Sequence, residues 1–232
     1  MKKIPIALTA MVIMFLFTTP AHATLWDRGG GLIYDDVLKV TWLQDTDYAV
    51  TSGYANGGMT WDVANAWAAQ LVYGGYDDWR LPDPADQPIE YIWGFDGTTT
   101  AGYNITASEI GYMYYVNLNN KGYYDTSGNG PQLGWNPMPN ASFTDGNGKA
   151  LSFQNLQSFD YWLAREYGSF NPPYGGRFDF NVGALSANTK DFGYPAWAVR
   201  NGDVSAIPEP ATMLLIGSGL LGLWGARRKF RK

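Results

Sequence analysis

The last twenty-six residues constrain the organisation of this chain most, because three features follow one another there in a fixed order. A stiff Pro-Glu-Pro segment at 208–210 is followed by an uncharged, largely apolar run at 211–226, and the chain ends with five positive charges within 227–232. A helix over the sixteen residues of the apolar run would be roughly 24 Å long, against about 30 Å of hydrocarbon in a bilayer. Flanking Lys and Arg side chains and local thinning of the bilayer can make up the difference. We therefore predict a transmembrane helix at 211–226 and a basic cytoplasmic tail at 227–232.

Two other interpretations of this tail stay open, namely a helix docked on the domain and a permanent membrane anchor. A docked helix needs a polar face toward water, and the run 211–226 has none. The three-part pattern resembles the PEP-CTERM protein-sorting signal. The resemblance implies a Gram-negative bacterium that makes extracellular polysaccharide, transient association with its inner membrane, and an exosortase-type membrane protease that cuts near the Pro-Glu-Pro and releases the upstream domain. The residues that carry the resemblance are Pro208, Glu209, Pro210, Arg227 and Arg228.

The N-terminus has the pattern of a secretory signal peptide. Lys2 and Lys3 precede an apolar run at 4–17, and Ala21 and Ala23 supply the small residues of a cleavage site. We predict a signal peptide over 1–23, export by the Sec machinery and cleavage before Thr24. An uncleaved N-terminal anchor is the alternative. Residues 24–204 are then the exported domain, and 205–210 are its linker with the Pro-Glu-Pro motif.

The composition of residues 24–207 narrows the classes of function. Nine Lys and Arg against twenty Asp and Glu give this part of the chain a net charge near −11. Such a charge disfavours nucleic acids as partners and is compatible with neutral glycans or cation-bridged acidic ones. The chain has no cysteine, and its one histidine, His22, lies in the predicted signal peptide. Disulfides, thiol nucleophiles and Ser-His arrangements are therefore excluded, which leaves an enzyme only carboxylates, Lys and Tyr.

Turn and strand signals alternate in the first part of the domain. Glycines at 29–31 break the chain, and the strand-like runs 32–34 and 38–43 are separated by Asp35 and Asp36. Adjacent acids are a candidate metal or acid pair, but in a strand turn they more often keep the loop solvated. Further strands are expected around Trp162, over 177–182 and over 196–200.

A helix is predicted directly after Thr60, its expected N-cap. Asp62 lies in the first turn, where a negative charge suits the helix dipole. Gly74 and Gly75 are expected to end the helix in left-handed backbone geometry. The apolar face of the helix is formed at positions i, i+3, i+4 and i+7 by Ala64, Trp67, Ala68 and Leu71.

A second resemblance begins where this helix ends. The run GGYDDWRLP at 74–82, together with residues 59–61, 161–162 and 196–200, is similar to the Lcl C-terminal domain family, which is placed among C-type-lectin-like folds. The resemblance implies a compact α+β domain with antiparallel strands, one or two helices, long loops on one side and terminal strands that pair. Many members carry cysteines that this chain lacks, so disulfide-stapled loops are not expected.

Trp79 and Arg80 within that run are candidate ligand-binding residues. An indole beside a guanidinium can stack on a sugar ring and hold its hydroxyl groups. The alternative is structural, with Trp79 buried and Arg80 paired to a neighbouring carboxylate such as Asp77 or Asp78.

The segment 84–148 is predicted to be a long loop region with one short helix around 107–117. Loops of this length are uncommon in compact domains and tend to be functional or disordered. Its tyrosines suit a glycan-binding surface, where ring faces combine with hydrogen-bonding groups, and packing of the loop onto the sheet is the equal alternative. Tyr123 and Tyr124 are the candidate ligand-binding pair.

The same loop region holds a candidate calcium site. Asp125, Ser127 and Asn129 place oxygen atoms at positions 1, 3 and 5 of an EF-hand-like loop, with glycine at position 6. Position 12 is Asn136, where a bidentate Glu is expected, and no helix precedes the loop. Plain Asx turns are the alternative. No other cofactor is expected.

Three classes of function follow. Export, charge, resemblance and aromatic loops favour a non-catalytic surface or matrix protein that binds extracellular polysaccharide. A structural surface protein without a small-molecule site fits the same features. The third class is a carboxylate-based glycan hydrolase, for which a pair such as Glu90 and Glu109 can always be nominated among twenty acids.

Overall fold

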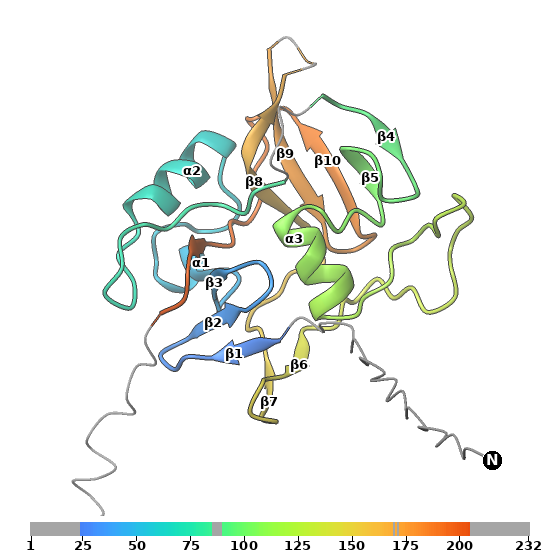
Figure 1. The fold of residues 1–232 in the computed structure, drawn as a ribbon. Helices are drawn as coiled ribbons and strands as arrows, with labels where there is room; N and C mark the ends of the chain where they lie inside the picture. The colour runs from blue at the N-terminus through green and yellow to red at the C-terminus, as the bar shows by residue number, and fades with distance from the viewer. Residues whose placement is uncertain (1–23, 85–89, 169, 171, 205–232) are drawn as a thin grey trace, which may run out of the picture.

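The computed structural model describes residues 24–84, 90–168, 170 and 172–204 (Figure 1). The predicted signal peptide, the Pro-Glu-Pro motif and the predicted sorting helix lie outside these residues. Within the described ranges, no helix has the length and the apolar character needed to cross a bilayer. The described domain is mostly β-sheet with few helices, and its strands form one four-stranded sheet, one five-stranded sheet and one two-stranded hairpin.

The four-stranded sheet contains the first and the last strand of the domain. Its order is β1-β2-β3-β11, and every pair in it is antiparallel. The sequence-predicted strands before and after Asp35 and Asp36 are confirmed. The second of them starts only at Val40, because Lys39 has a φ of +57° in the turn. The terminal strand β11 pairs with β3 and not with β1, so the direct pairing of terminal strands expected from the resemblance is wrong. The four strands are β1 (Leu25–Asp27), β2 (Leu32–Asp35), β3 (Val40–Leu43) and β11 (Val199–Asn201).

The five-stranded sheet has the order β4-β5-β10-β9-β8, in which only β4 and β5 are parallel. The strand around Trp162 is confirmed as β8, whereas the strand expected over 177–182 is shifted, because the chain turns after Asp179. Three strands of this sheet have no counterpart among the predicted ones. The elements are β4 (Trp93–Gly94), β5 (Ala101–Tyr103), β8 (Asp160–Tyr167), β9 (Tyr174–Asp179) and β10 (Ala184–Asn188), and the separate hairpin consists of β6 (Ser142–Thr144) and β7 (Ala150–Ser152).

The predicted helix after Thr60 is confirmed as α2 (Trp61–Gln70), with Ala64, Trp67 and Ala68 buried. The predicted end of this helix is wrong. Leu71 is already extended, and Gly74 and Gly75, with φ of +62° and +86°, form a two-residue turn instead. The backbone N–H groups and carbonyls of Tyr73 and Tyr76 bond to each other across this turn at 2.9 and 3.0 Å. Positive φ at both central residues is the geometry of a type I′ hairpin turn. The other helical segments are α1 (Tyr48–Thr51), α3 (Glu109–Tyr112) and the π-helical η1 (Met113–Asn117).

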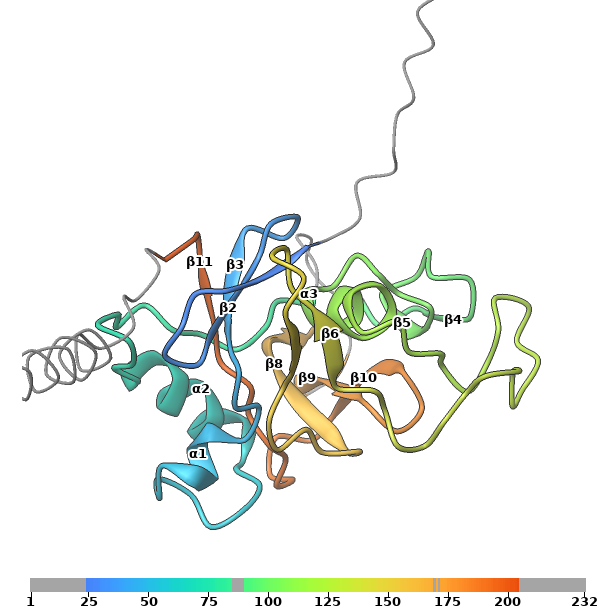
Figure 2. The ribbon, with the colours of Figure 1, turned by 90° about the horizontal axis from the view of Figure 1, so that it is seen from below.

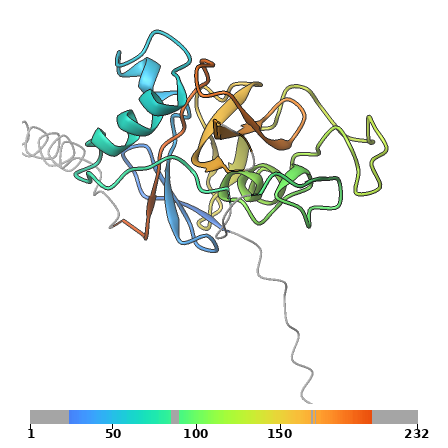
Figure 3. The ribbon, with the colours of Figure 1, turned by 90° about the horizontal axis from the view of Figure 1, so that it is seen from above.

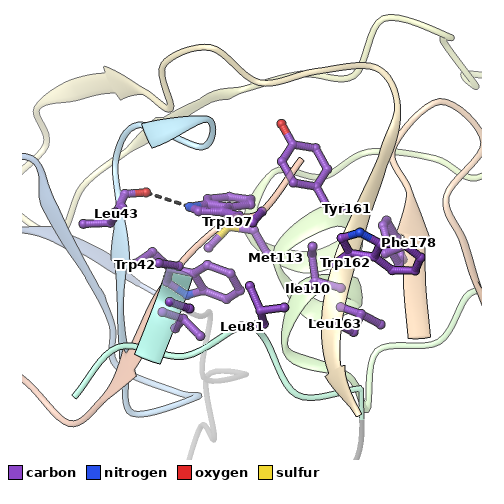
Figure 4. Packing of buried hydrophobic residues seen from close by; sticks show 14 of the residues in the cluster. Trp42, Leu43, Leu81, Ile110, Met113, Tyr161, Trp162, Leu163, Phe178 and Trp197 are labelled. Carbon is purple, nitrogen blue, oxygen red and sulfur yellow. Dashed lines mark hydrogen bonds between the residues drawn. The ribbon is translucent and has the colours of Figure 1, made fainter. Parts of the chain in front are cut away.

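The core lies between the two larger sheets and is built around buried indoles (Figure 4). The Trp197 ring lies 4.7 Å from that of Trp42 and 4.8 Å from that of Phe153, and its Nε1–H donates to the Leu43 carbonyl at 2.7 Å. The Trp162 Nε1–H donates to the Met59 carbonyl at 2.6 Å. These two large apolar rings are therefore buried without leaving their N–H groups unpaired.

One long connection stands out from this compact body. The chain between η1 and β6, yellow-green in Figure 1, extends away from the sheets on the side of β4 and β5. The views from below and from above show the same projection (Figures 2 and 3). The long loops expected on one side of the domain are therefore present, and they adjoin the edge of the five-stranded sheet.

Candidate functional site

Trp79 is a core residue. Its side chain is 3% exposed, its Nε1–H donates to the Tyr76 carbonyl at 3.2 Å, and its ring packs against that of Tyr73 with centroids 6.2 Å apart. A ring this deeply buried has no free face for a sugar. The structure therefore assigns Trp79 to the structural alternative and not to a binding surface.

Arg80 is held by a carboxylate that is distant in the sequence. Its two terminal nitrogens donate to the two carboxylate oxygens of Glu109 at 2.7 Å each, and its Nε–H donates to Asn201 Oδ1 at 3.2 Å. Burial alone would lower the pKa of Arg80, but the hydrogen bonds and the charge of Glu109 outweigh it and raise the pKa. The neighbouring acid Asp78 pairs with Arg200 instead, at 2.6 Å. Arg80 therefore ties α3 to β11, beside a polar cleft of about 360 Å³.

The candidate calcium loop folds around its own carboxylate. Asp125 Oδ1 accepts the backbone N–H groups of Ser127 and Asn129, both at 2.9 Å. Asp145 repeats the pattern with the N–H groups two and four residues ahead, at 2.9 and 2.8 Å, and both turns have a glycine with φ near +80° three residues after the acid. These are Asx turns. In the part of the chain that the structure describes, no group of three or more His, Cys, Asp or Glu side chains is placed to hold a metal ion.

Tyr123 and Tyr124 belong to a continuous series of ring contacts, which we call the aromatic band. The series runs from β4 and β5 into the projecting loop. Neighbouring ring centroids along it are 6.2, 5.7, 4.9, 4.8 and 4.9 Å apart, and Phe95 joins it by stacking on Tyr103 at 5.8 Å. All seven rings come from the segment 84–148, which the sequence predicts to be a long loop region. In order, the aromatic band consists of Tyr91, Trp93, Tyr103, Tyr124, Tyr123 and Trp135, with Phe95 beside Tyr103.

Backbone contacts and small residues hold the aromatic band in place. Asn104 Nδ2 donates to the carbonyls of Phe95 and Tyr124 at 2.7 and 3.2 Å, and so ties the end of β5 to the loop. The Asp125 turn places Gly128 against the Phe95 ring, where an added Cβ would lie 3.1 Å from the ring edge. Gly130 is still tighter, since a Cβ there would lie 2.7 Å from Tyr124. The supposed calcium loop therefore supports the rings.

The aromatic band is partly open to solvent. Trp93 is 44% exposed, and Phe95, Tyr123, Tyr124 and Trp135 are half-buried. Tyr103 lies beneath them, and its burial, followed by the proximity of Tyr124, raises its pKa to about 12. The density of tyrosines in the sequence pointed to Tyr123 and Tyr124, whereas the other rings of the band, Tyr91, Trp93, Phe95, Tyr103 and Trp135, were missed. The sequence signal that could have revealed Trp93 is the pair of aromatic residues at the alternate positions 93 and 95, before a turn rich in Gly and Thr.

Two acids face each other across β8 and β9, which is the arrangement that a carboxylate enzyme would require. Asp160 and Asp179 are cross-strand partners, and burial raises the pKa of Asp160 to about 6, helped by Asp179 and opposed by Arg177. Arg177 binds the Asp160 carboxylate directly, and Asp179 Oδ1 accepts the N–H of Asn181 at 2.8 Å. Asp160 is therefore engaged in an ion pair between β8 and β9, and Asp179 stabilises the turn that follows β9.

The raised pKa of Asp160 has a consequence for stability. An unfolded Asp loses its proton near pH 3.9, so between about pH 4 and 6 the folded state holds a proton that the unfolded state has lost. This group therefore makes the free energy of unfolding fall as the pH rises through that window, by about 2 kcal/mol. We expect Asp160→Asn to remove the fall, as measured by urea unfolding of both proteins at pH 4.0 and 6.5. If the wild type instead becomes more stable relative to Asp160→Asn as the pH rises, the charge of Arg177 outweighs burial and lowers the pKa of Asp160.

The comparisons with known proteins concern the tail. Residues 206–229 match the model of the PEP-CTERM protein-sorting motif. No curated protein and no solved structure matches the chain, so the resemblance to the Lcl C-terminal domain family and to C-type-lectin-like folds stays a prediction. The motif match is enough to state the route that the protein takes: it is exported with a C-terminal sorting signal and is processed by an exosortase, a membrane protease.

Proposed function

We propose that the exported domain binds extracellular polysaccharide through the aromatic band and that it catalyses no reaction. The observation that carries the proposal is the unbroken series of ring contacts from Tyr91 to Trp135, with Trp93 exposed at the sheet edge. Half-open aromatic faces offer apolar area at low cost in conformational entropy, and neighbouring amide and hydroxyl groups bind sugar hydroxyls.

The net charge of the domain and its resemblance to a known family favour the same class of ligand. A domain with a net charge near −11 repels polyanions, which favours neutral glycans or acidic glycans bridged by cations such as Ca²⁺. The resemblance of the domain to a C-type-lectin-like family supports a binding function over a catalytic one. We also propose Sec-dependent export, from the signal-peptide pattern at the N-terminus, and a Gram-negative source that makes extracellular polysaccharide, as the sorting signal implies.

Trp93→Ala is the variant that tests the aromatic band. We expect the exported, processed protein to bind polysaccharide shed by the producing cells with saturation, and Trp93→Ala to weaken binding about tenfold, or about 1.4 kcal/mol. Phe192→Ala is the matched control, because Phe192 is 50% exposed and lies outside the band. Isothermal titration of all three proteins, with Ca²⁺ and with EDTA, measures the effect.

The outcomes separate the three classes of function. Binding that is absent in both conditions, or that Phe192→Ala weakens as much as Trp93→Ala does, contradicts the proposal and leaves a structural surface protein. Release of new reducing ends from the polysaccharide contradicts the non-catalytic part alone. Binding lost only in EDTA assigns a cation to the ligand contact.

A further inference from the structure

The adjacent acids Asp35 and Asp36, in the turn between β2 and β3, have different partners. Asp35 is fully buried, and its Oδ1 accepts the N–H groups of Val37 and Leu38 at 2.9 Å each. Its Oδ2 accepts Asn117 Nδ2–H at 2.6 Å, and burial raises the pKa of Asp35. Asp35 therefore shapes the turn and joins it to η1. None of these contacts involves Asp36.

Asp36 contacts the beginning of the exported domain. Its Oδ1 accepts the backbone N–H of Thr24 at 2.9 Å, and its Oδ2 accepts the Nε1–H of Trp26 at 3.1 Å. The backbone N–H of Asp36 donates in turn to the Thr24 carbonyl at 3.2 Å. Thr24 is thus bound at both its nitrogen and its oxygen by one residue, and it directly precedes β1, whose Leu25 pairs with Asp35.

The position of this contact coincides with the predicted site of signal-peptide removal. Hydrolysis of the bond between Ala23 and Thr24 consumes one water molecule. The carbonyl carbon of Ala23 takes the oxygen of the water and leaves as a carboxylate, and the Thr24 nitrogen gains both protons of the water and becomes an ammonium group. We propose that Asp36 is the binding site for this newly formed α-ammonium group of Thr24, so that signal-peptide removal itself completes an ion pair at the edge of the first sheet.

The charge change strengthens a contact that already exists. Before cleavage the Thr24 nitrogen has one N–H and no charge, and after cleavage it has three donors and a positive charge. The Asp36 carboxylate already makes this contact a charge-assisted hydrogen bond, and the ammonium group adds the Coulomb attraction between two opposite unit charges. The ion pair therefore fixes β1, an edge strand of only three residues, after the domain has left the cytoplasm.

Other charged groups near this strand are engaged elsewhere. Lys149, from the β7 hairpin, pairs with Asp27 at 2.7 Å, and Arg28 pairs with Asp203 at 2.6 Å. Tyr112, on α3, faces the two acids of the turn, and its pKa is raised by burial and then by the charges of Asp35 and Asp36. Asp36 is thus the carboxylate that directly meets the Thr24 nitrogen.

The test compares the processed protein with a form that carries two extra alanines before Thr24. The extension keeps the amide N–H beside Asp36 but moves the ammonium group away. We expect the extended form to have an unfolding equilibrium constant about fivefold larger at pH 6.5. A carboxylate partner raises the pKa of an amino group above its ordinary value of about 7.7–8.0, so the stabilisation is complete below that pH and is lost as the pH rises through the raised value. The fivefold gap is therefore expected to close by about pH 10.5.

Asp36→Asn is introduced into both the processed and the extended form as the control. With Asn at position 36, the fivefold difference in unfolding equilibrium constant between the two forms at pH 6.5 is expected to vanish. Because Asn also changes the acceptor of Trp26, only the difference between the two forms is interpreted. Should the Asn variants not fold, titration of the Thr24 α-amino group by NMR decides the question. An ordinary pKa for that group, an N-terminal sequence that does not begin at Thr24, or equal stability of the two forms at pH 6.5 would each overturn the proposal.

Discussion

Trp197→Ala is expected to lower the free energy of unfolding by about 3–5 kcal/mol, the range for removing a large aromatic from a packed core. The ring is fully buried, contacts Trp42 and Phe153, and donates its only N–H to Leu43. Its removal leaves a cavity between the two larger sheets and an unpaired carbonyl on β3. A loss of this size is a large part of the 5–15 kcal/mol that typically holds a domain together.

Urea unfolding followed by tryptophan fluorescence measures this loss, and Trp93→Ala is the control. Trp93 is 44% exposed, so its truncation is expected to change the free energy of unfolding by less than about 1 kcal/mol. The two indoles thus have opposite predicted effects, with Trp197 needed for stability and Trp93 for polysaccharide binding. A Trp93→Ala protein as unstable as Trp197→Ala would contradict this division, because it would make the aromatic band part of the core.

Gly102→Ala is expected to separate β4 from the rest of its sheet. Gly102 has a φ of +115°, and a Cβ at this position would lie 1.8 Å from the carbonyl oxygen of Gly94 in β4. Neither the strand backbone nor the left-handed conformation accommodates alanine there. We expect a loss of about 2–4 kcal/mol from the combined strain and overlap, and a loss of polysaccharide binding because Trp93 moves with β4.

Gly53→Ala is the matched control for this substitution. Gly53 has a φ of +80°, and an added Cβ there would meet no atom within 4 Å. Gly53→Ala therefore introduces the backbone strain without the steric overlap, and we expect it to lower the free energy of unfolding by about 1–2 kcal/mol. The chemical shifts of the Trp93 indole report on β4 directly. Unchanged shifts and unchanged binding in Gly102→Ala would disprove the proposed role of the β4–β5 contact.

Local patterns predicted the elements whose residues repeat with a clear period. The apolar face of α2 and the runs on either side of Asp35 and Asp36 are examples. Strands such as β10, with the sequence ALSAN, escaped prediction because they are short and combine small and polar residues. Glycine at 74 and 75 was assigned to the wrong turn, since positive φ is required both at a helix end and in a type I′ hairpin.

The candidate site was predictable only in part, for a related reason. A cluster of tyrosines indicated Tyr123 and Tyr124, but which rings they meet depends on contacts of their loop with Phe95 and Tyr103, which are 29 and 21 positions before Tyr124. Trp79 and Arg80 had a convincing local pattern, yet tertiary contacts decided their role. Glu109, the partner of Arg80, is 29 positions further along the chain. Short-range sequence patterns contain no information on such pairs.

The pairing of β11 with β3 sets the order of events as the chain crosses the membrane. Val199 opposes Trp42, so the first sheet remains incomplete until nearly the whole domain is available to fold. Contacts between residues so far apart in sequence form late and slowly. Only six residues, 202–207, lie between Asn201 and Pro208. The sorting motif, matched over residues 206–229, therefore directly follows the strand that completes the first sheet.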